Sequence, residues 1–345
     1  MPVEEDLSWP NVLTTLLARH PLDEEVAAAA MRDIMEGVAT PAQVGAFVVA
    51  LRAKGETVDE IVGLVRTMRA YGARVPITGP LLDTCGTGGD RSGTFNVSTA
   101  AALVCAAAGA RVAKHGNRAA SSRCGSADVL EALGVVIDLS PQGVAECIEE
   151  AGIGFCFAPI FHPAMRHAAV PRRELGIPTV FNFLGPLTNP AGATRQAVGA
   201  SDLPMLEKMV EVLARLGSER VIGFHGHGGL DELSTSGPST VVELKDGKID
   251  RWTIGPEDLG FDLAALEQLR GGTAAENAHL IRSLFDGEAG PRRDIVLLNA
   301  AAGLLAAGIV SGMEQGVGRA ADALDSGAAA ATLDRMITAS AAASR

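Results

Sequence analysis

Three of the four residues at 86–89 are glycine, and they directly follow a short, mostly apolar run at 81–85. A turn without side chains lets backbone N–H groups approach an anion closely. The run is not a Walker loop, because no Gly-Lys-Ser/Thr follows, and it is not the dinucleotide fingerprint, because Arg91 stands where the third glycine should be. The pattern favours an anion-binding loop, and its spacing alone leaves a structural tight turn open.

A second candidate for anion binding lies at residues 96–99, Asn-Val-Ser-Thr, before an Ala-rich stretch that is predicted to be helical over 99–110. In the simpler interpretation, Ser98 or Thr99 caps this helix. In the functional one, the free N–H groups of the same helix terminus attract phosphate, and a hydroxyl meets a hard cation. The two interpretations are compatible.

Three cations and three serine hydroxyls are concentrated in residues 114–126, KHGNRAASSRCGS. A solvated charged face usually alternates its signs, whereas no Asp or Glu occurs here between Arg111 and Asp128. Clustered donors and cations in a chain of negative net charge favour a pocket for a phosphate-rich ligand over ordinary surface chemistry.

The dipeptide Asp231-Glu232 follows an apolar run at 221–224 that is predicted to be a strand. Adjacent carboxylates at the carboxyl end of a strand suit Mg²⁺, a hard cation that takes one or two carboxylates together with phosphate oxygens. Acidic pairs are common in loops, so this pair alone is a weak signal. A phosphate pocket elsewhere in the chain strengthens it.

Other polar residues receive a plainer interpretation. The histidines at 162, 167, 225 and 227 lack metal-ligand spacing, and we expect them to line a pocket or to form hydrogen bonds. Cys85 has no identifiable basic partner, so its thiol is not expected to act as a nucleophile.

The elements that would position these residues are of two kinds. Residues 1–72 show helical periodicity and no strand-like alternation: Thr40-Pro41 begins one helix that ends before Gly55, and a capping box at 57–60 begins another. After Pro80, helices predicted over 99–110, 141–151 and 203–216 alternate with strands over 81–85, 155–158 and 221–224. This alternation implies βα units and a mostly parallel sheet.

Two further segments lie outside this alternation of helices and strands. Residues 171–190 are rich in Pro, Gly and Asn, and they are predicted to be a long functional loop or a crossing between domains. The longest apolar run, 295–310, is too short to span a bilayer and is predicted to be a buried helix.

Composition limits the class of protein. The length of 345 residues suits two domains or one large one, and 47% apolar residues are ample for a core. A net charge of −12 argues against sequence-independent binding of nucleic acid. Five widely spaced cysteines and the lack of a signal peptide or membrane span predict a reduced, cytoplasmic protein that does not associate with membranes.

In this order, seven segments resemble the anthranilate phosphoribosyltransferase family. They are GTGGD at 86–90, TFNVST at 94–99, KHGNRAASSRCGSADVLEALG at 114–134, HPAMR at 162–166, FNFLGPLTNP at 181–190, GLDE at 229–232 and RDIVLLNAA at 293–301. The resemblance implies an α/β protein of the nucleoside phosphorylase type III and phosphoribosyltransferase fold. A small all-helical N-terminal domain, residues 1–72 rejoined by about 167–189, would be linked by hinges to a larger α/β domain over 76–166 and 190–345.

The same resemblance implies the ligands anthranilate, 5-phosphoribosyl diphosphate (PRPP) and two Mg²⁺ ions, and a homodimer. Metal ligands would be Ser98, Asp231 and Glu232, and anthranilate would meet Gly86, His115, Asn117 and Arg172. The implied PRPP-binding residues are Gly86, Gly89, Asp90, Thr94, Asn96, Val97, Ser98, Thr99, Lys114, His115, Gly116, Asn117, Arg118, Ala119, Ala120, Ser121, Ser122 and Ser126.

The implied reaction moves the phosphoribosyl group of PRPP to the amine of anthranilate, the second step of tryptophan biosynthesis from chorismate. Such a transfer needs no general base, because an aromatic amine is already a neutral nucleophile. Lys114, Asn117 and Arg172 would contribute electrostatically. Two alternatives are a pyrimidine nucleoside phosphorylase, which works with inorganic phosphate and without magnesium, and a non-catalytic paralogue that binds nucleic acid.

Overall fold

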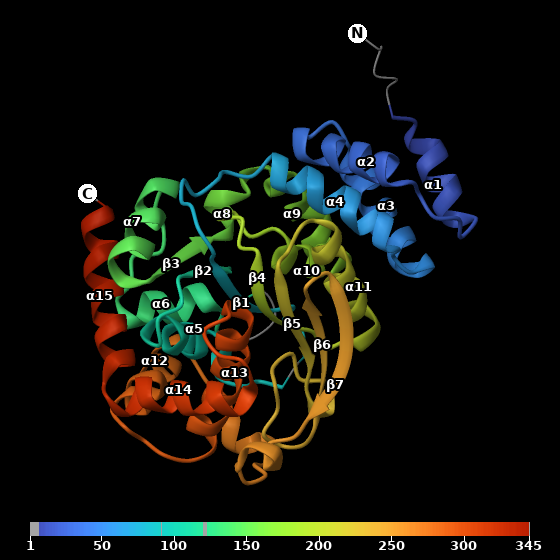
Figure 1. Ribbon diagram of the computed structural model, residues 1–345. Helices are drawn as coiled ribbons and strands as arrows, with labels where there is room; N and C mark the ends of the chain where they lie inside the picture. Colours follow the sequence, from blue (N-terminus) through green and yellow to red (C-terminus); the bar gives the residue numbers. More distant parts are fainter. Residues whose placement is uncertain (1–6, 91, 120–122, 345) are drawn as a thin grey trace.

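The computed structural model describes residues 7–90, 92–119 and 123–344, and its centre is a seven-stranded sheet in the order β3-β2-β1-β4-β5-β6-β7 (Figure 1). The first five strands along the chain run parallel to one another, which confirms the mostly parallel sheet. The last two form a hairpin at one edge whose inner strand is antiparallel to the fifth, which the sequence patterns did not indicate. The strands are β1 (Leu82–Gly86), β2 (Val112–Gly116), β3 (Ile153–Phe157), β4 (Arg195–Gly199), β5 (Arg220–His225), β6 (Ser239–Lys245) and β7 (Lys248–Ile254).

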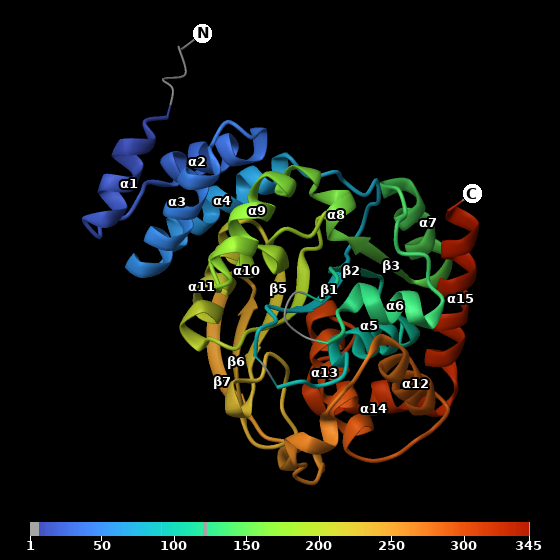
Figure 2. The same cartoon turned by 180° about the vertical axis from the view of Figure 1, so that it is seen from behind.

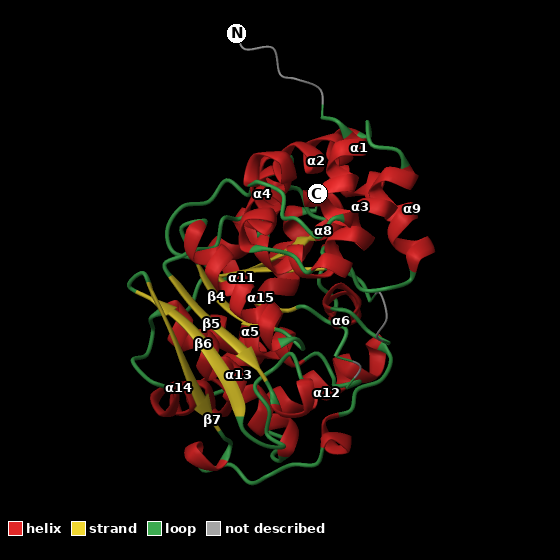
Figure 3. Ribbon diagram, turned by 90° about the vertical axis from the view of Figure 1, so that its right-hand side faces the viewer, coloured by secondary structure: helices red, strands yellow, loops and turns green. Residues whose placement is uncertain are grey.

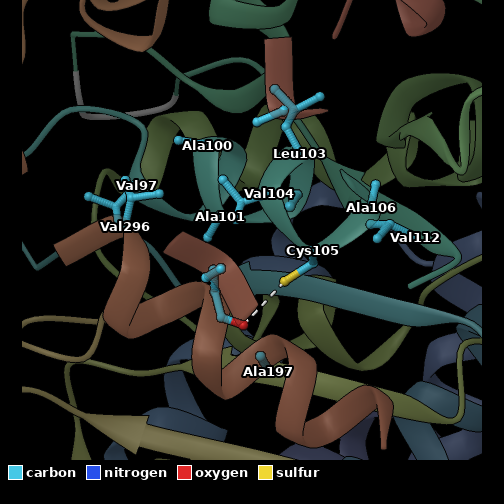
Figure 4. Packing of buried hydrophobic residues seen from close by; sticks show 14 of the residues in the cluster. Val97, Ala100, Ala101, Leu103, Val104, Cys105, Ala106, Val112, Ala197 and Val296 are labelled. Atoms are coloured by element: carbon cyan, nitrogen blue, oxygen red, sulfur yellow. Dashed lines mark hydrogen bonds between the residues drawn. The ribbon is translucent and has the colours of Figure 1, made fainter. Parts of the chain in front are cut away.

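One face of the sheet carries the largest core, formed with α5 (Val97–Ala107) and α13 (Pro291–Ala307). Both helices are Ala-rich, so they approach closely, and Cys105 Sγ donates to the Ala300 carbonyl at 3.4 Å (Figure 4). The burial of α13 confirms the helix predicted at 295–310. Further helices of the α/β part are α6 (Ser126–Leu133), α7 (Pro141–Ala151), α11 (Leu203–Arg215), α12 (Ala274–Phe285), α14 (Met313–Asp325) and α15 (Ala328–Ala343).

In its described residues the N-terminal part consists of helices and short connecting turns, with no strand, as predicted, and it sits at one end of the molecule (Figure 3). Thr40 and Thr57 each cap a helix through a complete capping box, which satisfies N–H groups of the first turn. Its helices are α1 (Trp9–Leu17), α2 (Glu24–Glu36), α3 (Pro41–Lys54) and α4 (Val58–Ala70). They share a core with α11 and with the other face of the sheet.

Three local predictions were wrong in extent or kind. The helix predicted over 99–110 spans Val97–Ala107, and the strand predicted over 155–158 spans Ile153–Phe157. Of the two predictions for the segment 171–190, one long loop is wrong, since α9 (Arg166–Leu175) runs through Pro171 and α10 (Phe181–Leu184) follows. The other, a crossing between the two parts, agrees with the structure, because α9 packs on α2 and α3 and the chain then returns to β4. The short α8 (Ala158–Phe161) precedes them.

The order of the strands defines where a ligand would bind. From β1 the chain adds β2 and β3 on one side, and it then crosses back to place β4 on the other side of β1 (Figure 2). In open α/β sheets, ligands bind beyond the carboxyl ends of the strands where the order reverses in this way. That point lies beyond Gly86 and Gly199, which are register partners at the ends of β1 and β4.

No helix in the described part of the chain is both long and apolar enough to cross a bilayer.

Candidate active site

A pair of buried carboxylates faces the Gly-rich loop at this point of the sheet. The Gly88 N–H donates to Asp231 Oδ2 at 2.6 Å, and the Ser98 N–H donates to Glu232 Oε1 at 3.2 Å. Asp231 is 9% exposed and Glu232 is 8% exposed. The glycine loop, the start of α5 and the acidic pair are three separate motifs in the sequence, which the family resemblance assigns to one site, and in the structure they lie together.

The close approach of Asp231 explains two glycines. A Cβ atom at Gly86 would overlap Asp231 Oδ2, and a Cβ atom at Gly199 would overlap the Asp231 carbonyl oxygen. Both residues have ordinary negative backbone angles, so the requirement is for space and not for a left-handed conformation. Gly86 is thus needed for the carboxylate pair, besides any contact with an anion.

Several charges are buried next to one another here. Burial, reinforced by the negative charge of Asp90, raises the pKa of Asp231 to about 7. Burial and the neighbouring Asp231 raise the pKa of Glu232 well above its usual range. Asp90 Oδ2 is also buried and has no hydrogen-bond partner within the described structure. This excess of buried negative charge would be relieved by a cation.

Lys114 supplies one positive charge to the cluster from the middle of β2. Its side chain is 2% exposed, and its Nζ donates to the Thr84 carbonyl at 2.5 Å and to Ser98 Oγ at 3.5 Å. Burial lowers the pKa of Lys114, while the nearby carboxyls of Asp83 and Glu232 oppose that shift. The ammonium group therefore lies beneath the acidic pair and not on an exposed anion-binding surface.

The sequence between Arg111 and Asp128 holds cations and no carboxylate, but in the structure Arg118 is paired with carboxylates from the following helix. Its guanidinium forms ion pairs with Asp128 at 3.0 Å and Glu131 at 2.8 Å, and it lies over the Phe157 ring. Asp128 also accepts from the N–H groups of Ala119 and Gly125, at 2.9 and 2.8 Å. Asp128 thus organises the loop after β2, a role that sequence reasoning missed although the residue stands two positions after the Ser126 that it singled out.

The remaining predicted PRPP-binding residues of the loop after β2 are only partly described. Ser126 begins α6, and its Oγ donates to the Asn117 carbonyl at 3.3 Å. Its hydroxyl occupies the space that a side chain at Gly116 would need. The predictions for Ala120, Ser121 and Ser122 fall outside the described residues.

The start of α5 corrects the capping interpretation. Asn96 is the N-cap residue and makes no side-chain cap, so Ser98 and Thr99 lie inside the first turn and neither caps the helix. The Asn96 side chain instead donates to the Cys124 carbonyl at 3.3 Å and accepts from Asn277 at 2.9 Å. Val97 is buried in the core, so only its backbone is available to a ligand.

The loop between the glycines and α5 is held by short polar contacts. The Ser92 N–H donates to Asp90 Oδ1 at 3.1 Å, and the hydroxyls of Ser92 and Thr94 are 3.2 Å apart. Thr94 is paired through a β-bridge with Arg270. Gly89 has a positive φ of 80° in an exposed turn, a backbone that favours glycine.

Two buried histidines lie beside the acidic cluster. The backbone N–H of His115 donates to Asp83 Oδ1 at 3.1 Å, and the ring centroids of His115 and His162 are 5.1 Å apart. His115 Nδ1 is 3.1 Å from the Gly185 carbonyl, which connects β2 to the segment after α10.

Arg172, predicted to bind anthranilate, lies on α9 with its guanidinium over the Phe181 ring at 5.4 Å. The simpler expectation for His225 is confirmed, since its Nδ1 bonds the Ala200 carbonyl.

The histidine pair predicts acid sensitivity of folding. Burial lowers the pKa of both His115 and His162 to about 4, so both rings are neutral in the folded chain at pH 7. Between pH 6.5 and 4 these two rings bind more protons in the unfolded chain, so their contribution to the free energy of unfolding falls as the pH falls, by up to about 1.4 kcal/mol per ring for each step of one in pH. The raised pKa values of Asp231 and Glu232 act in the opposite direction over this range, so the histidine contribution is read as the difference between wild type and a histidine variant. Urea unfolding at pH 7, 6 and 5 measures it. Relative to wild type, His115→Gln/His162→Gln should lose less stability, or gain more, as the pH falls from 7 to 5, whereas the exposed-site control His279→Gln should follow wild type. Equal slopes in all three proteins would contradict the assignment.

Known proteins match both parts of the chain. A model of the glycosyl transferase family a/b domain matches residues 78–330, and one of the glycosyl transferase family helical bundle domain matches residues 10–72. The anthranilate phosphoribosyltransferase of Roseiflexus castenholzii is 55% identical over 323 residues, which cover 93% of this chain and 95% of that protein. The chain belongs to the anthranilate phosphoribosyltransferase family. It is therefore expected to share the family's transferase class as well as its fold.

Solved structures agree with that membership. The anthranilate phosphoribosyltransferase of Thermus thermophilus has a TM-score of 0.88 and 47% identity, covering 95% of this chain and 99% of its own. The enzyme of Saccharomyces cerevisiae, solved in complex with PRPP and Mg, has a TM-score of 0.82 and 27% identity, covering 97% and 94%. Both matches span the helical part and the α/β part, so the fold expected from the resemblance is confirmed.

Proposed function

We propose that this chain transfers the phosphoribosyl group of PRPP to the amine of anthranilate, giving N-(5-phosphoribosyl)anthranilate and diphosphate in tryptophan biosynthesis. One observation carries the proposal at the level of the site. The Gly-rich loop, the first turn of α5 and the buried Asp231-Glu232 pair meet beyond the carboxyl ends of β1 and β4. A site of this kind can hold a diphosphate group next to a cation.

The residues present fit magnesium. Asp231, Glu232 and the Ser98 hydroxyl offer hard oxygen donors, and burial next to one another raises the pKa of both carboxyls, so a bound cation would favour their charged forms. The described residues hold no group of three or more His, Cys, Asp or Glu side chains arranged for an ion. The chain would therefore share its ions with ligand oxygens, and we propose two of them. When bound, Mg²⁺ neutralises the charge of the departing diphosphate.

The roles of the other residues follow from their positions. The Gly-rich loop over residues 86–89 and the start of α5 would bind the diphosphate end of PRPP, with Asp90, Thr94 and Asn96 holding the loop. The loop after β2 would bind its remaining phosphate and ribose, with Arg118 leaving its carboxylate partners to do so. Gly86, His115, Asn117 and Arg172 would bind anthranilate, whose carboxylate suits the planar guanidinium of Arg172.

Catalysis in this proposal is positional and electrostatic. Positive charge develops on the ribose ring as diphosphate leaves, and the amine attacks C1 without prior deprotonation. Lys114 holds a positive charge under the site, and its Nζ contacts Thr84 and Ser98 rather than solvent. Alignment of two bound substrates can supply roughly 7 kcal/mol or more of the barrier. Exclusion of water between the helical and α/β parts would protect PRPP from hydrolysis.

Loss of anthranilate fluorescence tests the reaction directly. Emission should fall only when protein, PRPP and Mg²⁺ are all present, and diphosphate should appear in equal amount. Unchanged emission, with thymidine or uridine split by inorganic phosphate, would replace the transferase with a nucleoside phosphorylase. No turnover in either assay would contradict catalysis and lead to a nucleic-acid binding titration.

We also propose a homodimer that forms through the N-terminal helices. Leu17 on α1, Val49 on α3 and Val170 on α9 are apolar and exposed, and α3 contacts both α1 and α9. Exposed apolar side chains on helices that pack on one another are typical of a subunit interface.

A cytoplasmic location is proposed as well, supported by five cysteines that are all free thiols and all buried.

Charge placed on this surface should separate the subunits. Leu17→Glu combined with Val49→Asp is expected to shift the chain from a dimer to a monomer at micromolar concentration, because charged groups are costly to bury in an interface. Light scattering after gel filtration measures the mass. Leu263→Glu is the matched control, since Leu263 is 59% exposed but belongs to the α/β part. A dimer that survives the double change would exclude this surface.

A further inference from the structure

The strands β1 and β2 are neighbours inside the sheet, yet they pair at a single position. That position is Leu82 with Val112, where the Leu82 N–H donates to the Arg111 carbonyl at 2.9 Å. On their other sides, β1 pairs with β4 over five positions and β2 pairs with β3 over five (Figure 1). The interruption is therefore confined to the space between β1 and β2, and it includes the carboxyl ends of both strands, Gly86 and Gly116.

The register shows which main-chain groups lose their partners. If the pairing continued, Thr84 would face Lys114. The Thr84 N–H would then donate to the Ala113 carbonyl, and the His115 N–H would donate to the Thr84 carbonyl. The pairing does not extend to this position, and side chains bond three of these four groups instead.

Two of the three groups are bonded by buried charged side chains. The backbone N–H of His115 donates to Asp83 Oδ1 at 3.1 Å, and the Thr84 carbonyl accepts from Lys114 Nζ at 2.5 Å. Asp83 is fully buried and Lys114 is 2% exposed. Burial raises the pKa of Asp83, and the Asn189 amide and the Lys114 ammonium nearby oppose that rise. Each strand thus extends a charged side chain to the main chain of the other.

The third group is bonded from outside the sheet. Asn189 belongs to the connection between α10 and β4, and its amide donates to the Ala113 carbonyl at 2.8 Å. Its side-chain oxygen accepts from the Ala191 N–H at 2.9 Å, which fixes the orientation of the amide. The side chains of Asp83, Lys114 and Asn189 together are called the strand insert below.

Folding alone does not account for the strand insert. A continued ladder would satisfy the same groups with backbone partners and would bury no charge. Replacement of a buried ion pair by apolar side chains of similar volume is often neutral or stabilising, because desolvation of the two charges is unfavourable. Asp83 Oδ2 is moreover buried without a hydrogen-bond partner within the described structure. An arrangement that is unfavourable for stability in this way points to a role in the neighbouring site.

We propose that Asp83 and Asn189 are positioning residues, which set the distance between the carboxyl ends of β1 and β2 through the strand insert. The inference rests on the proposed function. There, the loop after β1 binds the diphosphate end of PRPP, and the loop after β2 binds its remaining phosphate and ribose. One substrate therefore bridges the two strand ends, and its binding depends on their spacing. Neither Asp83 nor Asn189 needs to touch the substrate for this role.

Fragments of PRPP separate spacing from general damage. Diphosphate with Mg²⁺ tests the loop after β1 by itself, and ribose 5-phosphate tests the loop after β2. In calorimetric titrations of the full chain, Asp83→Ala should bind PRPP about tenfold more weakly, with less than about a twofold change for either fragment. Asp83→Asn should recover most of the PRPP affinity, because its amide oxygen can still accept the backbone N–H of His115.

Ser340→Ala is the matched control. Ser340 is also fully buried, and its hydroxyl accepts the backbone N–H of the distant Val136 at 3.0 Å, but it lies on α15, outside the sheet. This variant should lower the free energy of unfolding and leave all three affinities unchanged. Asn189→Leu removes the donor to Ala113 at similar volume. It should repeat the selective loss, and it carries the test if Asp83→Ala does not fold.

The outcomes distinguish this inference from the proposed function. A wild-type chain that fails to bind PRPP or its fragments would overturn the proposed function and this inference with it. If the wild type binds all three, an equal loss for PRPP and a fragment, or unchanged PRPP affinity in the variants of Asp83 and Asn189, would overturn the positioning role alone. Asp83→Asn as impaired as Asp83→Ala would do the same, because the hydrogen bond to His115 would then not matter.

Discussion

Replacement of Asp231 by Asn together with Glu232 by Gln is expected to lower kcat/KM for PRPP about 10³-fold, as removal of a central electrostatic group does in other enzymes. The amides keep the shape of the pair and can still accept from the N–H groups of Gly88 and Ser98. They cannot balance a divalent cation. Folding should survive, because the change removes two buried negative charges whose burial is unfavourable.

Initial rates of anthranilate consumption over a series of Mg²⁺ concentrations measure this effect. The variant should lose both the rate and its dependence on Mg²⁺, while urea unfolding shows equal or greater stability. Asp286→Asn is the control, since Asp286 is exposed and remote from the acidic pair. A double variant that retains more than a tenth of the wild-type rate would contradict a metal-binding role for these carboxylates.

The change Gly199→Ala is expected to be nearly as severe, although residue 199 makes no proposed contact with substrate. A methyl group there would overlap the carbonyl of Asp231, so the loop that carries the acidic pair must move away from β4. A displacement of about 1 Å at a catalytic group can cost about 10²-fold in rate. We therefore expect a loss of that order in kcat, accompanied by weaker dependence on Mg²⁺.

The matched control is Gly318→Ala. Gly318 lies in α14, where an added Cβ would meet no atom within 4 Å, and alanine favours helix over glycine. That variant should keep full activity and gain slightly in stability. If Gly199→Ala also kept full activity, the position of the Asp231 backbone would not matter for the reaction.

The elements that local chemistry determines could be predicted from the sequence. The helices that begin at Thr40 and Thr57 carry their own capping boxes, and α7 begins at a Ser140 side chain that accepts from the Gly143 N–H. The hairpin of β6 and β7 and the helix α9 could not be predicted in this way. The hairpin is an edge whose outer strand is largely exposed, and α9 tolerates Pro171 because it packs on α2 and α3.

The candidate site was predictable where it consists of compact motifs and not where it depends on contacts between distant segments. Asp231 and Glu232 stood out as adjacent carboxylates after a strand. Asp83 did not stand out, because its contact is with a different strand: its fully buried carboxylate on β1 accepts the backbone N–H of His115 on β2. Asn189 was missed for the same reason, since its amide donates to the Ala113 carbonyl at 2.8 Å, far away in sequence.

The crossing of the chain from β3 back to β4 has a consequence for synthesis on the ribosome. When β1 first emerges, only β2 and β3 can join it, and the edge that will receive β4 stays unpaired until residues 195–199 have left the exit tunnel. The acidic pair arrives later still. A nascent chain therefore carries an open strand edge through much of its translation, a state that invites misassociation. Synonymous changes that slow elongation between codons 157 and 195 should raise the fraction of newly made protein that aggregates.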